Sequence, residues 1–315
     1  MKYLGQIKKG GIVLTLIFFI VTTFISCSRT NESSDKVKIG YLAITHALPL
    51  FEESLENKSV ELIKFGSWSE LMEALNSGKI QGASVLIELA IKSKMQGINL
   101  KAVALGHRDG NAVVVSENIN SVKDLKGKNF AIPNKLSTHN ILFYEMLKKE
   151  NMSIKDINLT ELPPSEMAVA LFEGRIDGYC VAEPFGAKAV VNGNGKVLKE
   201  SSDIINNSIC CALVFREEFI NNQKETAKTL AEDYIKVAKY LEENKDKSKE
   251  KAKEFLKVQR EVLETSLDLI KFDDLKIKKE DYEVIGDYLK EMGLMDNVPS
   301  YEDFVDNSLI DWGLK

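Results

Sequence analysis

Residues 69–85, SELMEALNSGKIQGASV, and residues 165–181, SEMAVALFEGRIDGYCV, are two versions of one pattern, 96 positions apart. Eight of the seventeen positions are identical. Each copy has an apolar-striped run, then a glycine, then Ile-x-Gly and a second apolar run. Such a run predicts a helix that ends at the glycine and is followed by a strand. The fold is therefore expected to use one helix–strand unit twice, in two lobes.

Strand-like and helix-like segments alternate around both copies. A capping box begins the first helix, since Ser67 precedes Glu70 by three residues, and Gly78 fits its end. This alternation predicts an α/β fold with mostly parallel strands. From Arg216 onward the sequence is mostly amphipathic helix. Strands are predicted at 36–42, 60–65, 100–106, 111–117, 128–133, 157–163 and 209–215.

Two Thr-His pairs accompany the repeat. Thr45-His46 and Thr138-His139 are 93 positions apart, and each follows a predicted strand. Ligands of open parallel sheets gather at the carboxyl ends of the strands. We therefore expect both pairs to line one cleft, one from each lobe. Further candidate ligand contacts are the segments after the paired strands, with Ser84, Glu183 and Phe185.

The third histidine also follows a strand-like run. His107 begins the segment His107-Arg108-Asp109-Gly110-Asn111. Three hypotheses stay open for these loops. They bind a small anion or polar ligand, with donors from the helix start at Ser137 and charge from Arg108. Alternatively, the three histidines bind a metal with an acidic residue, or histidine–acid pairs perform acid–base chemistry.

Composition narrows the function classes. The chain has 315 residues, a net charge of −5 and 28% charged residues, and its pI is near 5.5. A nucleic-acid partner is not expected, because it requires a basic face. Cys180, Cys210 and Cys211 lie in apolar runs and are expected to be buried free thiols, although Cys180 also has the option of a disulfide with either of the others.

The N-terminal segment has the layout of an export signal. Three lysines precede an uncharged apolar run at 12–25, which ends next to Cys27. The run is shorter than the ~20 residues of a spanning helix. Residues 1–26 are thus predicted to be a signal peptide, Cys27 a lipidation site and 27–35 a flexible tether. An uncleaved anchor and ordinary cleavage remain alternatives.

Several stretches resemble one family of transport proteins. They include IGYLAITHALPLF, WSELMEALNSGKIQGA, SVKDLKGKNFAIPNKLSTH and EGRIDGYCVAEPFGAKAV, and together they cover 37 to about 220. The sequence resembles the substrate-binding lipoproteins of ABC importers in the nitrate, sulfonate, taurine and thiamine-precursor group. A related branch is enzymatic and carries a cysteine-rich iron motif, whereas this chain has only ICCALVF. Neither enzymatic activity nor a cofactor is therefore expected.

The resemblance implies a type II periplasmic-binding-protein fold. Lobe 1 would comprise 36–112 plus 215–315 and lobe 2 would comprise 113–214, with crossovers near 112–115 and 212–215. A small solute would be trapped between the lobes and delivered to a membrane permease and its ATPase by a monomeric, lipid-anchored protein. The family pattern implies ligand contacts from Thr45-His46, from Ser137-Thr138-His139 and from Glu183 and Phe185, with Ser67 and Trp68 as further candidates.

Overall fold

The computed structural model describes residues 36–51 and 60–313. The predicted signal peptide, Cys27 and the tether to residue 35 lie outside the described residues. None of the helices in the described ranges combines the length and apolar character that crossing a membrane requires.

The first copy of the repeat belongs to a five-stranded sheet with the order β2-β1-β3-β11-β4. Strands β1 and β2 pair in parallel, as do β1 and β3, whereas β11 is antiparallel to both β3 and β4. Four of the strands therefore run in one direction. Their bounds are β1 Val37–Leu42, β2 Val60–Phe65, β3 Gly82–Leu86, β4 Leu100–Leu105 and β11 Cys211–Arg216.

The second copy belongs to a second five-stranded sheet, with the order β10-β6-β9-β7-β8. Here β7 pairs in parallel with β8 and β9, and β6 is antiparallel to β9 and β10. Read from its other edge, this sheet has the arrangement of the first, with one antiparallel strand in the fourth position. The bounds are β6 Asn111–Val115, β7 Asn129–Ile132, β8 Asn158–Glu161, β9 Gly178–Ala182 and β10 Lys196–Glu200.

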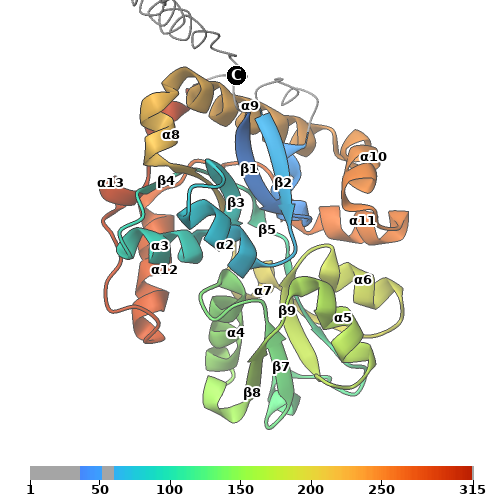
Figure 1. Cartoon of the computed structure of the whole chain (residues 1–315). Coiled ribbons are helices and arrows are strands. Elements are labelled where there is room, and N and C mark those ends of the chain that lie inside the picture. The colour runs from blue at the N-terminus through green and yellow to red at the C-terminus, as the bar shows by residue number, and fades with distance from the viewer. Residues whose placement is uncertain (1–35, 52–59, 314–315) are drawn as a thin grey trace, which may run out of the picture. The chain divides into compact units, whose positions relative to one another are not determined.

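Helices cover both sheets (Figure 1). Those of the first lobe are α2 Trp68–Asn76 and α3 Ile87–Met95, and those of the second are α4 Thr138–Lys149, α5 Pro164–Phe172, α6 Phe185–Val191 and α7 Ser201–Ile204. The C-terminal part returns to the first lobe as α8 Glu217–Asn222, α9 Lys224–Glu243, α10 Lys245–Leu256, α11 Arg260–Asp268, α12 Lys279–Glu291 and α13 Tyr301–Phe304. The short turns are η1 Thr45–Leu50, η3 Val122–Leu125, η4 Ile154–Asp156 and η5 Asn307–Leu309, and a small ribbon pairs β5 Arg108–Asp109 with β12 Ile270–Lys271.

The α/β fold of two lobes with mostly parallel strands is thus confirmed, and so is the capping of α2. Ser67 accepts a hydrogen bond from the N–H of Glu70 at its start. The sheets divide the chain a few residues away from the predicted lobe boundaries. The strand β11 belongs to the first sheet, so residues 211–214 are part of lobe 1, and 112 lies inside β6 of the second sheet. The chain therefore crosses over just before 111 and returns just before 211.

Glycines fix the repeated helix–strand joint. Gly78 and Gly174 end the two helices with φ of +77° and +69°, a conformation that other residues rarely adopt. Gly82 and Gly178 begin the two strands with an ordinary φ but without room for a Cβ. A Cβ on Gly82 would lie 2.5 Å from Phe215 Cδ1 and 2.8 Å from the carbonyl oxygen of Val214. Close approach of the antiparallel strand thus explains why Ile-x-Gly recurs.

We expect Gly82→Ala to lower the free energy of unfolding by about 1–3 kcal/mol, the usual cost of overpacking. The contact with a backbone oxygen has little freedom to relax. The matched control is Gly66→Ala, where the nearest atom is the end of the Glu70 side chain at 3.4 Å. Urea unfolding of both variants checks the prediction, and equal stability of the two would contradict it.

Candidate functional site

Thr45 joins the first lobe to the second. It is the first residue of η1, directly after the segment that leaves β1, and it is fully buried. Its backbone N–H and its hydroxyl donate to the carbonyl oxygen of Glu183, over 2.9 Å and 3.0 Å. Glu183 follows β9 in the other lobe. Its carboxyl Oε2 accepts from the N–H of Ala187 and lies 3.1 Å from the hydroxyl oxygen of Ser266, whereas Oε1 has no partner among the described residues.

Thr138 makes the reciprocal connection from the second lobe. Its hydroxyl oxygen lies 2.5 Å from Glu88 Oε1 and 2.9 Å from the carbonyl oxygen of Ile209. Glu88 is in the first turn of α3, directly after β3. Each threonine of the repeated pairs therefore contacts the segment that follows the third strand of the opposite lobe.

The contacts of Thr138 require a proton on Glu88. A hydroxyl has one proton, and the carbonyl of Ile209 can only accept, so the second short contact needs a donor on the carboxyl side. Burial points the same way, because it disfavours the charged form and raises the pKa of Glu88 to about 7. Burial likewise raises the pKa of Glu183 to about 7.

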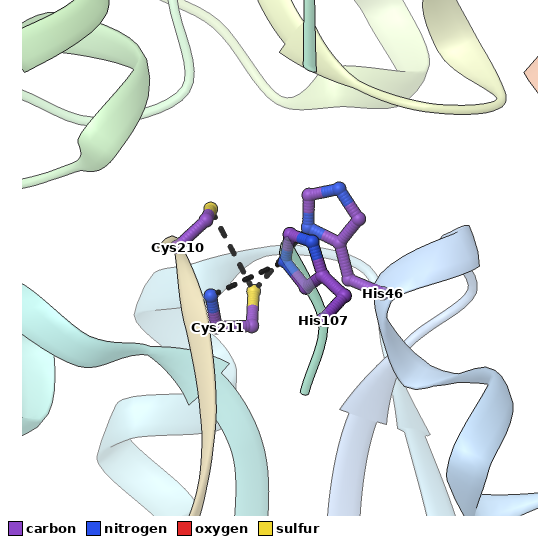
Figure 2. Close-up of side chains that lie close together, drawn as sticks. All are labelled: His46, His107, Cys210 and Cys211. Carbon is purple, nitrogen blue, oxygen red and sulfur yellow. Dashed lines mark hydrogen bonds between the residues drawn. The ribbon is translucent and has the colours of Figure 1, made fainter. Parts of the chain in front are cut away.

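The imidazole rings of His46 and His107 stack on each other, with ring centroids 3.5 Å apart. His46 Nε2 donates to the carbonyl oxygen of Gly110 over 3.0 Å, which leaves its Nδ1 unprotonated in the neutral ring. That Nδ1 lies 3.6 Å from Cys211 Sγ. Figure 2 shows both rings beside Cys210 and Cys211. All four residues are buried, and their ligand-type atoms lie within 4.8 Å of one another.

His139 and Asn111 are buried without partners. Neither ring nitrogen of His139 and neither side-chain polar atom of Asn111 has a hydrogen-bond partner among the described residues. Burial, and then the neighbouring His46, lower the pKa of His139 to about 3, so the ring is neutral. Burial and His46 also lower the pKa of His107. Buried polar groups without a partner cost about 1–3 kcal/mol each, so these two side chains are energetically unfavourable features of the lobe contact.

Arg108 does not supply a free positive charge, which corrects the expectation for this residue. Its guanidinium is buried and forms an ion pair of 2.7 Å with Asp281. It also donates to the carbonyl oxygens of Asp274 and Asn207. These partners lie on the C-terminal part and on the return crossover, so Arg108 ties the two together.

Four other candidates have local structural contacts. Ser67 and Ser137 accept from backbone N–H groups as the N-caps of α2 and α4. Trp68 is buried in the core of lobe 1, and stacking on a ligand is thus not its observed role. Ser84 lies inside β3 rather than after it, because the strand continues to Leu86.

A cavity of about 380 Å³ opens between the lobes next to the segments that carry Thr45 and Glu183, and its lining includes neither Thr-His pair. Phe185, a predicted contact, is in its wall, and Lys64, Lys188 and Lys257 were not foreseen. The lysines are exposed, and none forms an ion pair with another described residue. The full lining is Leu42, Ala43, Lys64, Phe65, Gly66, Pro164, Ser165, Pro184, Phe185, Lys188, Leu256, Lys257 and Val258. A larger cavity of about 490 Å³, between α9 and residues 272–276, contains none of the predicted residues.

Comparison with known proteins places the chain in a family. A model of the NMT1-like family matches residues 30–256, most of the chain. The chain belongs to the NMT1-like family. It is 39% identical to the ligand-binding component of an ABC-type import system from Staphylococcus aureus, solved with zinc bound. The match covers 87% of this chain and 97% of that one, with a TM-score of 0.83.

Two curated relatives of this NMT1-like chain are transport proteins. One is a putative aliphatic sulfonates-binding protein of Escherichia coli, 27% identical over 58% of this chain and 60% of its own length. The other is the nitrate import ATP-binding protein NrtC of a Synechocystis species, 26% identical over 66% of this chain. The chain spans 35% of the length of NrtC.

We expect Glu88 and Glu183 to lower the stability of the protein as the pH rises from about 4.5 to about 7, whereas the buried His107 and His139, whose pKa is lowered in the folded state, raise it over the part of this window below about 6.5. The folded state holds protons on Glu88 and Glu183 in that window, whereas the unfolded carboxyls, with a pKa near 4.5, have lost them. Glu88→Gln keeps an uncharged group at one site and should remove about half of the carboxyl contribution, so the stability of this variant should fall less, or rise more, with pH than that of the wild type. Urea unfolding across the window measures it. Exposed Glu166→Gln is the control, and a Glu88→Gln profile parallel to that of the wild type would contradict the assignment.

Proposed function

We propose that the chain is the extracytoplasmic solute-binding component of an ABC importer. It captures a small solute in the cavity between its lobes, without converting it chemically, and delivers the solute to a membrane permease that works with an ATPase. The observation that carries the proposal is this cavity, which is lined from both lobes and adjoins the segments that carry Thr45 and Glu183. Names of the relatives, which are import and binding proteins, support it.

The lining favours an organic anion over a neutral heterocycle. Three exposed lysines approach the cavity from β2, α6 and the α10–α11 turn, and Phe65, Phe185 and Leu256 give it an apolar wall. An aliphatic sulfonate matches both features, since its charged end is met by ammonium groups and its alkyl chain by the apolar wall. Among the sulfonate, nitrate, taurine and thiamine-precursor classes, we therefore propose a sulfonate or taurine-like solute.

A metal-binding or catalytic protein built on His46, His107 and His139 was the alternative. As an account of solute capture it has less support, because among the described residues the donors that converge with His46 and His107 are cysteine sulfurs of the same lobe rather than His139. Zinc nevertheless belongs in the ligand panel, since the Staphylococcus aureus relative was solved with zinc bound.

We expect Lys64→Ala/Lys188→Ala/Lys257→Ala to weaken binding of an alkanesulfonate by about tenfold or more. Exposed ion pairs contribute up to about 1 kcal/mol each, and about 1.4 kcal/mol corresponds to tenfold in affinity. Calorimetric titration at low and high salt measures the loss, and Lys155→Ala on η4 is the matched control. Unchanged affinity in the triple variant would place the solute elsewhere, and no thermal shift with any solute of the panel would contradict capture itself.

Lipid anchoring through Cys27 is the proposed attachment to the membrane. Cys27→Ala cannot be acylated, so we expect this variant to appear in the soluble fraction after signal cleavage, whereas the wild-type protein sediments with membranes. Metabolic labelling with a fatty acid and cell fractionation measure both properties. Retention of the cleaved variant in the membrane would contradict the lipoprotein assignment.

A further inference from the structure

The side chains of His46, His107, Cys210 and Cys211 form a donor group that the solute proposal does not use. We propose that these four residues hold one soft transition-metal ion of the zinc class, resident in lobe 1 and separate from the captured solute. The site does not depend on the chain being an importer component, because its ligands lie outside the lining of the interlobe cavity.

The spacing of the donors matches tetrahedral coordination. Zinc bonds of about 2.3 Å to sulfur and about 2.0–2.1 Å to nitrogen, at tetrahedral angles, separate two sulfurs by about 3.8 Å and a sulfur from a nitrogen by about 3.6 Å. The observed separations are 3.9 Å between Cys210 Sγ and Cys211 Sγ and 3.6 Å between Cys211 Sγ and His46 Nδ1. All four donor atoms are within 4.8 Å of one another, so the group needs only small side-chain movements to close around an ion.

Each of the two histidines has a ring nitrogen whose lone pair can bind a metal. The hydrogen bond from His46 Nε2 to the carbonyl oxygen of Gly110 fixes the tautomer whose Nδ1 carries the lone pair, and it is the kind of outer contact that orients metal-bound imidazoles. His107 Nε2 accepts only a long hydrogen bond of 3.4 Å from the N–H of Cys211. Its Nδ1 has no partner among the described residues.

Charge balance favours a divalent ion, and the ligand types favour a soft one. Two thiolates, two neutral imidazoles and one divalent cation sum to zero, so the assembled site can be buried without a net charge. Sulfur and imidazole ligands select zinc-class metals, whereas magnesium and calcium require oxygen ligands. The four donor residues are each fully buried, which also fits a closed site with no exchangeable position.

All four ligands come from the carboxyl-end edge of the first sheet. His46 follows β1, His107 follows β4, and Cys210 and Cys211 are at the start of β11. A cargo site in a two-lobed protein takes ligands from both lobes, so that release follows opening. A site contained in one lobe keeps its ion when the lobes separate, which is the reason for assigning the metal as resident.

The test is reconstitution of the chelator-treated mature protein with zinc or cobalt(II). We expect one metal per chain by mass spectrometry of the metal, a thiolate-to-cobalt charge-transfer band, and protection of Cys210 and Cys211 from alkylation. Cys210→Ser and His107→Gln should each weaken binding by more than about 100-fold, the upper end for loss of an outer contact. Cys180→Ser, a buried thiol outside the cluster, should bind as the wild type does.

Two results would overturn the proposal. One is the absence of stoichiometric metal and of alkylation protection in the wild-type protein, which needs no variant to fold. The other is a loss of affinity in the lobe 2 variants His139→Ala and Glu183→Gln as large as in Cys210→Ser, which would make the ion a cargo held between lobes. Alkanesulfonate binding by folded Cys210→Ser, measured in parallel, separates failure of the metal site from failure of solute capture.

Discussion

The reciprocal contacts between Thr45 and Glu183 and between Thr138 and Glu88 are the constraint around which the site is organised. Both pairs are buried, so water cannot replace a missing partner, and a buried polar group without one is costly. Each lobe must therefore place its threonine beside the segment that follows the third strand of the other lobe. Because a histidine follows each threonine, the same constraint carries His46 and His139 to the meeting edge of the two sheets.

The repeated unit was predictable because its causes are local. Gly78 is needed for a left-handed helix end and Gly82 for contact with a neighbouring strand, and both requirements leave a mark in the sequence. The predicted lobe boundary at 214 differs from the sheet membership of β11 for a non-local reason. Strand β11 is buried on both faces, and an evenly apolar run does not indicate which of two sheets it will join.

The candidate site was predictable only in part. The Thr-His pairs were found because they repeat beside predicted strands. Arg108 was misjudged because its acidic partner Asp281 is 173 positions away, and no pattern in the sequence joins them. Glu88 was missed although it stands two residues after β3, much as Glu183 stands one residue after β9. A comparison of the two copies beyond the end of each strand would have identified Glu88, because an acidic residue follows the strand in both copies.

The interlobe cavity and the histidine–cysteine cluster share no residues. The cavity offers ammonium groups and apolar walls from both lobes, so the affinity for the proposed solute would depend on how the lobes are placed relative to each other. The cluster offers thiols and imidazoles from lobe 1 alone, and its neighbour in the chain, Thr45, is the residue that contacts Glu183. Because none of the four cluster residues lines the cavity, a change of metal ligand leaves the groups that would meet a solute in place. Loss of the ion and loss of solute binding are therefore separable properties of this chain.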